Sequence, residues 1–157
     1  KRAQWDLANR YVDIPDQLCE MGRFGRKTGA GYYLYDADGT KQRDPQVEAL
    51  IIAASAQKAI VRQDLSAADI QMRALAAIVN EAALLVAEGV ALRPGDVDVA
   101  LVNGYGFARW LGGPVHWAQQ QDPAVLAQAC AQWVEISGPA RSLADLRVLG
   151  VQTGDTA

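Results

Sequence analysis

The residues best suited to chemistry are three cations in a glycine-rich run. Arg23, Arg26 and Lys27 lie between positions 22 and 31, together with four glycines. Backbone N–H groups in glycine turns and cationic side chains both attract phosphoryl oxygens, so the run is a candidate phosphate site. Its spacing fits neither the G-x-x-x-x-G-K-[ST] pattern of a Walker A loop nor a G-x-G-x-x-G fingerprint that follows a strand. A turn-rich connector with solvated cations is the alternative interpretation, and both stay open.

A second candidate is the polar pair Asn80–Glu81, which interrupts an otherwise apolar stretch. A polar group buried without a partner costs about 1–3 kcal/mol, so both side chains need partners. Either the pair hydrogen-bonds the backbone of a neighbouring loop, or Glu81 acts as a general base. No nucleophile or acid lies near Glu81 in the sequence, so we expect the first arrangement.

His116 is the only histidine and follows Gly113-Pro114-Val115, at the expected start of a helix. Nucleophilic catalysis needs a base and a group that orients it, so this lone histidine is expected to pack or cap rather than react. One histidine and two distant cysteines, Cys19 and Cys130, do not make a metal-ligand set. The sequence therefore predicts no catalytic, cofactor-binding or metal-binding residues.

Composition and charge narrow the class of protein. Of the 157 residues, 50% are hydrophobic and 21% are charged, as in ordinary globular domains. The net charge of -3 argues against a general affinity for nucleic acid or acidic membranes. The apolar run over 74–87 is too short and too polar for a bilayer, so we expect no membrane span.

The two distant cysteines fit free thiols in a cytoplasmic protein, with a disulfide left open. The chain starts at Lys1 rather than Met, which predicts a piece of a longer protein.

Helical periodicity and helix-start residues predict the elements that position these candidates. The longest is a helix over 67–88, opened by a capping box at Ser66 and Asp69 and stopped by Gly89. Its apolar positions cover most of the circumference, so we expect it to be central and mostly buried. Other helices are expected over 3–11, 15–21, 44–61, 92–104, 114–121 and 123–134, and after a second capping-box form at 142–145. Short strands over 32–35 and 40–43 complete a mainly α fold with a small β element near 31–43.

Two sets of motifs resemble a known family. Residues 22–33, Gly-Arg-Phe-Gly-Arg-Lys-Thr-Gly-Ala-Gly-Tyr-Tyr, resemble the G-R-F-G-Q-K-T-G-x-G-[FYW]-Y signature that closes the first C-terminal repeat of 3-hydroxyacyl-CoA dehydrogenases. Ordered motifs farther along resemble the second repeat of the multifunctional β-oxidation enzymes, at 79–82, 88–91, 96–98, 103–107 and 112–114. The resemblance extends from Pro15 to Trp117, and a series of ordered motifs is more specific than a single one. The chain is thus similar to the C-terminal portion of a 3-hydroxyacyl-CoA dehydrogenase of the multifunctional fatty-acid β-oxidation type.

The resemblance implies a domain organisation and an activity for the parent protein. It implies the tail of a preceding helical repeat over 1–43, a linker helix over 44–65 and a second helical repeat over 66–157, in a fold of the 6-phosphogluconate-dehydrogenase C-terminal type. The parent would oxidise (3S)-hydroxyacyl-CoA to 3-oxoacyl-CoA with NAD, which binds in a separate N-terminal domain. A hydratase domain elsewhere in the parent stays open. The isolated chain is expected to bind no cofactor and to be inactive.

Within this family, the present portion would shape the acyl-CoA cleft and the assembly of a homo-oligomer. Arg23, Arg26 and Lys27 are then the best candidates for contact with a phosphate of CoA, by charge alone. Two positions depart from the family pattern, because Met72 replaces a functional Asn and Gln119 replaces an Asp. A non-catalytic structural or dimerisation module is therefore the alternative.

Overall fold

The computed structural model describes residues 12–152, so the helix predicted over 3–11 lies outside the described residues. The chain divides into two compact units, whose described parts are residues 12–64, the N-terminal unit, and residues 65–152, the C-terminal unit. The described residues form six α-helices, short 3₁₀ helices and a two-stranded sheet, which confirms the mainly α fold class. The assignment of segments to a repeat tail, a linker helix and a second repeat stays a prediction.

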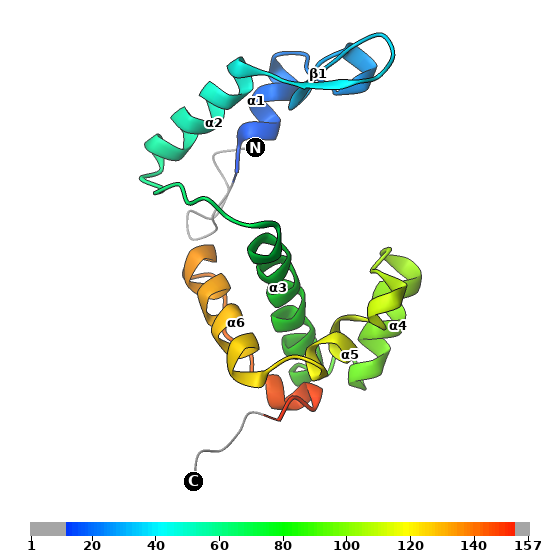
Figure 1. Ribbon diagram of the computed structural model, residues 1–157. Helices are drawn as coiled ribbons and strands as arrows, with labels where there is room; N and C mark the ends of the chain where they lie inside the picture. The colour runs from blue at the N-terminus through cyan, green and yellow to red at the C-terminus, as the bar shows by residue number, and fades with distance from the viewer. Residues whose placement is uncertain (1–11, 153–157) are drawn as a thin grey trace. The chain divides into compact units, whose positions relative to one another are not determined.

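In the N-terminal unit, a β-hairpin lies between two helices along the chain (Figure 1). The strands pair antiparallel, with Tyr33 opposite Arg43 and Tyr35 opposite Lys41. The two helices contact each other and form a small apolar core. The elements, in chain order, are α1 (Ile14–Glu20), the 3₁₀ helix η2 (Arg26–Thr28), β1 (Tyr33–Tyr35), β2 (Lys41–Arg43) and α2 (Pro45–Gln57).

The C-terminal end of α2 differs from the prediction. The helix ends at Gln57 rather than at residue 61, because Ala59 has a left-handed φ of 51°. The Ala59 N–H donates to the Ala56 carbonyl at 3.1 Å, and the Ile60 N–H donates to the Ser55 carbonyl at 2.9 Å. These two bonds form the Schellman arrangement that closes many helices, usually around a glycine. The sequence offers no glycine here, so the ending was not predictable from composition.

The C-terminal unit is built around α3 (Ala67–Ala87), as predicted. In Figure 1, α3 runs beside α6 (Pro123–Ser137), with which it has its most extensive contact. It also contacts α4 (Pro94–Gly104), α5 (Pro114–Gln119) and the 3₁₀ helix η4 (Leu146–Leu149), while η3 (Arg109–Leu111) lies between α4 and α5 in the sequence. The core side chains come mainly from α3, α5, α6 and η4, and include Ala76, Val79, Ala83, Val115, Ala118, Leu126, Cys130 and Leu149.

α3 has the predicted start and the predicted N-terminal capping box. Ser66 Oγ accepts the Asp69 N–H at 3.1 Å, and Asp69 Oδ2 accepts the Ser66 N–H at 3.0 Å. The helix is less buried than expected, since Ile70 is 56% exposed and Glu81 is also exposed. By length and composition alone α3 is long and apolar enough to cross a membrane, which is weak evidence for a span. The core helix of a globular unit passes the same test.

Asp98 joins α4 to the start of α5. Its carboxylate oxygens accept the N–H groups of Val115 at 2.7 Å and of His116 at 3.1 Å. These are two of the donors that a helix start leaves without an intrahelical partner. Gly113, with a φ of 118°, lies against the same carboxylate, and a Cβ at this position would collide with Asp98. Both the backbone conformation and the close approach therefore require glycine at residue 113.

Asn80 is fully buried on α3 and binds the backbone of the 142–144 loop. Its Nδ2 donates to the Ser142 carbonyl at 3.0 Å, and its Oδ1 accepts the Ala144 N–H at 2.9 Å. These bonds confirm the predicted backbone partners for Asn80. The capping box predicted at 142–145 is wrong, because Asp145 itself caps η4 and accepts the Arg147 N–H at 3.0 Å.

Replacing Asn80 by alanine should destabilise the C-terminal unit by about 1–3 kcal/mol, because it removes two hydrogen bonds from a fully buried position and leaves the Ser142 carbonyl and the Ala144 N–H without this partner. Urea unfolding followed by circular dichroism measures the loss. Asn103→Ala is the matched control, since exposed Asn103 donates to the Val99 carbonyl of its own helix at 2.9 Å. That variant should stay within about 0.5 kcal/mol of the parent. Equal losses in the two variants would contradict a special role for Asn80.

Candidate functional site

The glycine-rich run folds into a loop between α1 and β1. Gly25 and Ala30 form an antiparallel bridge, and Gly25 has a left-handed φ of 81°. Thr28 Oγ1 accepts the Phe24 N–H at 2.9 Å and donates to the Ala30 carbonyl at 3.0 Å. Gly31 packs so closely on Gly25 that a Cβ on Gly31 would lie 2.8 Å from the Gly25 Cα. The loop conformation is therefore fixed by its own backbone bonds and by close glycine packing.

Arg23 lies in a mostly buried ion pair rather than in solvent. Its guanidinium pairs with Asp44, and the two side chains are 11% and 7% exposed. Arg23 Nε also donates to the Gly31 carbonyl at 3.1 Å. Asp44 in turn caps α2, because its Oδ1 accepts the Gln46 N–H at 2.9 Å. Arg23 thus connects the loop to α2, and its charge is already compensated.

Two opposing effects act on the pKa of Asp44. Burial disfavours the charged form and raises the pKa, whereas the Gln46 N–H, the Arg23 guanidinium and the Val47 N–H stabilise the carboxylate. The hydrogen bonds and the positive charge outweigh burial, so the pKa of Asp44 lies below its usual value. The ion pair therefore persists at neutral pH and weakens only in acid.

The other two candidate cations, Arg26 and Lys27, are exposed on η2. The Arg26 guanidinium carbon lies 5.5 Å from the centre of the Tyr35 ring, a cation–π distance. Lys41 Nζ lies 5.1 Å from the centre of the Tyr33 ring in the same way. Among the described residues no carboxylate pairs with Arg26 or Lys27. Two of the three predicted cations thus keep an uncompensated charge.

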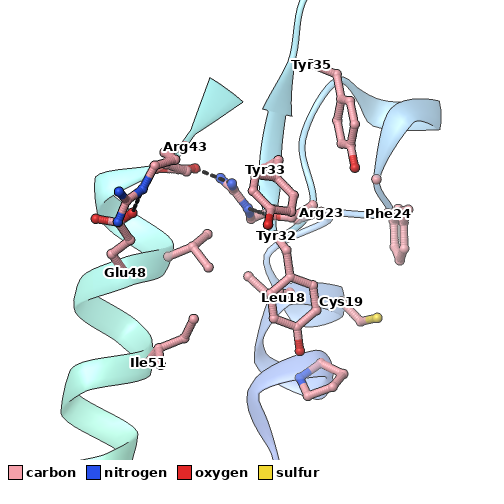
Figure 2. Close-up of a pocket in the computed structure, with 15 residues that line it drawn as sticks. Leu18, Cys19, Arg23, Phe24, Tyr32, Tyr33, Tyr35, Arg43, Glu48 and Ile51 are labelled. Atoms are coloured by element: carbon pink, nitrogen blue, oxygen red, sulfur yellow. Dashed lines mark hydrogen bonds and ion pairs between the residues drawn. The ribbon is translucent and has the colours of Figure 1, made fainter. Parts of the chain in front are cut away.

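A pocket of about 970 Å³ opens beside this loop (Figure 2). Figure 2 shows Leu18 and Cys19 coming from α1, and Ile51 and Glu48 coming from α2. Glu48 pairs with Arg43 Nε at 2.5 Å. The loop and β1 add aromatic side chains to the lining, namely Phe24, Tyr32, Tyr33 and Tyr35. The pocket therefore combines apolar helix residues, aromatic rings and two arginines, Arg23 and Arg43, that are both ion-paired.

The remaining candidates are Glu81, His116 and Cys130 in the C-terminal unit and Cys19 in the N-terminal unit. Glu81 is exposed and lines an apolar groove of about 790 Å³ between α3 and α4. The His116 side chain is exposed, and its backbone N–H is the group that binds Asp98. Cys19 and Cys130 are both free thiols, and burial raises the pKa of the Cys130 thiol to about 11. No cluster of three or more metal-ligating side chains occurs within residues 12–152.

The two departures from the family pattern have structural explanations. Met72 is partly buried and packs against the core of the C-terminal unit. Gln119 Nε2 donates to the Leu149 carbonyl at 2.7 Å. An ionised aspartate has no donor and could not make this bond. Met72 therefore contributes to core packing, and Gln119 provides a hydrogen-bond donor for the Leu149 carbonyl.

Comparisons with known proteins identify relatives of the chain. No family model matches it. The peroxisomal bifunctional enzyme of Homo sapiens is 39% identical over 111 residues, which cover 69% of this chain and 15% of that protein. The peroxisomal bifunctional enzyme of Danio rerio is 37% identical over 111 residues, 69% of this chain and 16% of that protein. The peroxisomal fatty acid beta-oxidation multifunctional protein of Oryza sativa subsp. japonica is 32% identical over 140 residues, 87% of this chain and 19% of that protein.

The chain is a homologue of one segment of the multifunctional β-oxidation proteins. This relationship confirms the resemblance carried by the glycine-rich run and by the ordered motifs that follow it. The chain spans less than a fifth of the length of the curated relatives it matches. The names of these relatives describe those proteins as peroxisomal.

Sequence reasoning found the cations of the loop but missed two features of the site. One is the role of Asp44 as the partner of Arg23, since the pattern marks Asp44 only as a helix start. The other is the pocket itself, which brings Phe24 and Tyr32 together with residues of both helices. Aromatic residues are dense beside the cations of the loop, and this density is the sequence signal for the pocket. The sequence analysis uses it only to predict a strand.

Replacing Asp44 by asparagine should lower the stability of the N-terminal unit and reduce its acid sensitivity. The folded-state pKa of Asp44 is depressed, so its carboxylate stabilises the fold above the ordinary aspartate pKa of about 3.9. That contribution is lost as the pH falls through the lower folded-state pKa. The free energy of unfolding should therefore fall more steeply below about pH 4 in the parent chain than in the variant.

Urea unfolding at a series of pH values measures this difference. Asp64→Asn is the matched control, because it removes an exposed carboxylate from the same unit. A loss of stability of the same size in both variants would contradict the role assigned to the Arg23–Asp44 pair.

Proposed function

We propose that the chain is part of an NAD-dependent 3-hydroxyacyl-CoA dehydrogenase of fatty-acid β-oxidation. The observation that carries this proposal is the 32–39% identity to multifunctional β-oxidation proteins. The parent would oxidise (3S)-hydroxyacyl-CoA to 3-oxoacyl-CoA, with the hydride from C3 passing to NAD and the hydroxyl proton passing to a base. An enzyme of this type acts on acyl-CoA thioesters, which are the proposed substrates.

The described residues do not fit an NAD site. A dinucleotide fingerprint follows a strand and opens a helix, so that the pyrophosphate meets the helix N-terminus. The glycine-rich loop here has the reverse order, since it follows α1 and leads into β1. We therefore place NAD in a separate N-terminal domain of the parent, and we assign no step of hydride transfer to this segment.

The role we propose for this segment is to bind and position the acyl-CoA substrate. Arg26 and Lys27 are exposed on η2 and have no carboxylate partner among the described residues, and Arg26 lies over Tyr35, which lines the pocket. Uncompensated charge of this kind suits contact with a phosphate of CoA. Arg23 was the third predicted cation. Its ion pair with Asp44 gives it a positioning role instead, because it holds the loop that carries the other two.

A structural or dimerisation role is the second proposal, and the C-terminal unit favours it. Beside the groove between α3 and α4, the side chains of Val90, Leu92 and Tyr105 are 70%, 87% and 82% exposed. Contiguous exposed apolar area of this kind often marks a surface that another protein covers. The proposed assembly is a homo-oligomer, and sedimentation of the full-length protein tests it.

The proposed location is cytoplasmic, because both cysteines are free thiols. Cell fractionation of the full-length protein tests this location. Recovery in an organelle fraction would contradict it.

The full-length protein that carries this segment should form NADH from a (3S)-3-hydroxyacyl-CoA, and residues 1–157 alone should not. The increase in NADH absorbance measures both. Absence of NADH formation by the full-length protein would contradict the proposed activity. Formation of NADH by the isolated segment would contradict the placement of the catalytic groups elsewhere.

Replacing both Arg26 and Lys27 by alanine in the full-length protein should raise the KM for the CoA thioester about tenfold, equivalent to about 1.4 kcal/mol. The kcat should change little, because contacts with a phosphate act equally on the bound substrate and on the transition state. Arg62→Ala is the control, since it removes an exposed arginine from the same unit. An unchanged KM would exclude a substrate role for the loop.

A further inference from the structure

The backbone at the end of α2 opposes the local sequence. Among the described residues, Ala59 is the only one other than glycine with a left-handed φ. That conformation is disfavoured for an L-residue by a population factor of about 5 to 30. No glycine or proline occurs between residues 57 and 65, and alanine is the strongest helix former. The local sequence therefore favours continuing the helix through the residue at which it is closed.

The closed ending is held by its backbone bonds and by Ile60. In a Schellman ending, an apolar residue directly after the left-handed position commonly packs against the last turn of the helix. Ile60 occupies that position and is half-buried. The next residue, Val61, is 84% exposed. The observed ending therefore covers one apolar side chain and leaves its neighbour in water.

A helix continued through residue 61 would exchange these two side chains. Val61 follows Val47 and Ala54 at intervals of seven residues, so the three would lie on one helix face. Val47 and Ala54 are 3% and 7% exposed, so this face is the buried one. Continuation would relax Ala59 and turn Val61 toward the buried face, but it would break the Schellman bonds and uncover Ile60. The two endings thus bury equivalent groups.

The place of Ala59 in the chain gives this exchange a consequence. Residues 58–66 connect α2 to α3, and the division between the two units falls after Asp64. Lys58 Nζ pairs with Asp13 Oδ1 at 2.8 Å, so the residue before Ala59 is anchored to the start of α1. Winding residues 59–61 from an extended chain into a helix shortens the connection by about 5 Å. A change at Ala59 therefore alters the connection and leaves the anchored part of α2 in place.

We propose that residues 58–61 are a two-state joint, in which α2 either ends at Gln57 or continues through Val61. Ala59 is the residue that switches, from a left-handed to a helical conformation. A molecule that binds both units shifts the balance toward the ending whose connection fits it. The joint is independent of the proposed function, because the exchange uses residues of α2 and its connection and needs no substrate.

Nuclear magnetic resonance of the 157-residue chain measures the balance through the Cα chemical shift of Val61. Ala59→Gly should lower the population of the continued helix about tenfold, because glycine is unstrained in the left-handed region and disfavoured in a helix. Ala59→Leu should raise that population, because leucine is a strong helix former and its side chain is crowded at a left-handed φ. The Val61 shift should therefore move toward helical values from the glycine variant to the parent chain and on to the leucine variant.

Ala53→Gly and Ala53→Leu are the matched controls, since Ala53 is an exposed alanine inside α2. Both should leave the Val61 shift at its value in the parent chain. Melts followed by circular dichroism show which variants are folded. An identical Val61 shift in the folded glycine and leucine variants at residue 59 would overturn the proposal, and so would equal movement in the Ala53 controls.

The exchange of the two apolar side chains has its own test. Ile60→Ser should raise the population of the continued helix, because it removes the side chain that the closed ending covers. Val61→Ser should lower that population, because it removes the side chain that the continued helix buries. Serine, isoleucine and valine have similar helix propensities, so propensity alone moves neither variant. The Cα shift of Lys58 should move in opposite directions in the two folded variants, and movement in the same direction would contradict a two-state joint.

Discussion

The N-terminal unit depends on the ion pair between Arg23 and Asp44. The two side chains are almost completely removed from water, so either charge would be costly to bury without the other. The same two residues bind the Gly31 carbonyl and the Gln46 N–H. One pair therefore fixes the end of the glycine-rich loop and the start of α2 at the same time. The pair thus adds a tertiary anchor to a loop whose own backbone bonds and glycine packing already fix its conformation.

The C-terminal unit uses polar side chains in the same way. Asn80 binds the backbone of the 142–144 loop from the middle of α3, and Asp98 binds the first N–H groups of α5 from α4. In each case a side chain on one helix satisfies backbone groups of a segment far away in the sequence. Because unsatisfied buried backbone groups are costly, these bonds specify where the connecting segments lie. Apolar packing alone would not specify those places.

The sequence predicted those features that depend on neighbouring residues. The start of α3 follows from the Ser66 and Asp69 capping box, and its end follows from Gly89. The end of α2 was missed because Ala59 occupies a left-handed position that glycine usually fills. The partner of Arg23 was missed because Asp44 lies 21 residues away, and only the tertiary fold brings the two together. A pattern shows which charges are present, but only the structure shows which of them are compensated.

The two units differ in how many of their polar side chains are already bonded, and therefore in what each can contribute to a substrate site. In the C-terminal unit, Asn80, Asp98 and Gln119 are already bonded to backbone groups, and Met72 belongs to the edge of the core. In the N-terminal unit, Arg26 and Lys27 have no carboxylate partner among the described residues, and Arg26 lies over Tyr35, which lines an aromatic pocket. The free energy of ligand binding comes from groups that the folded protein leaves available, after the cost of ordering the ligand. We therefore propose that the polar contact with a substrate falls to the N-terminal unit, while the C-terminal unit offers apolar surface and shape.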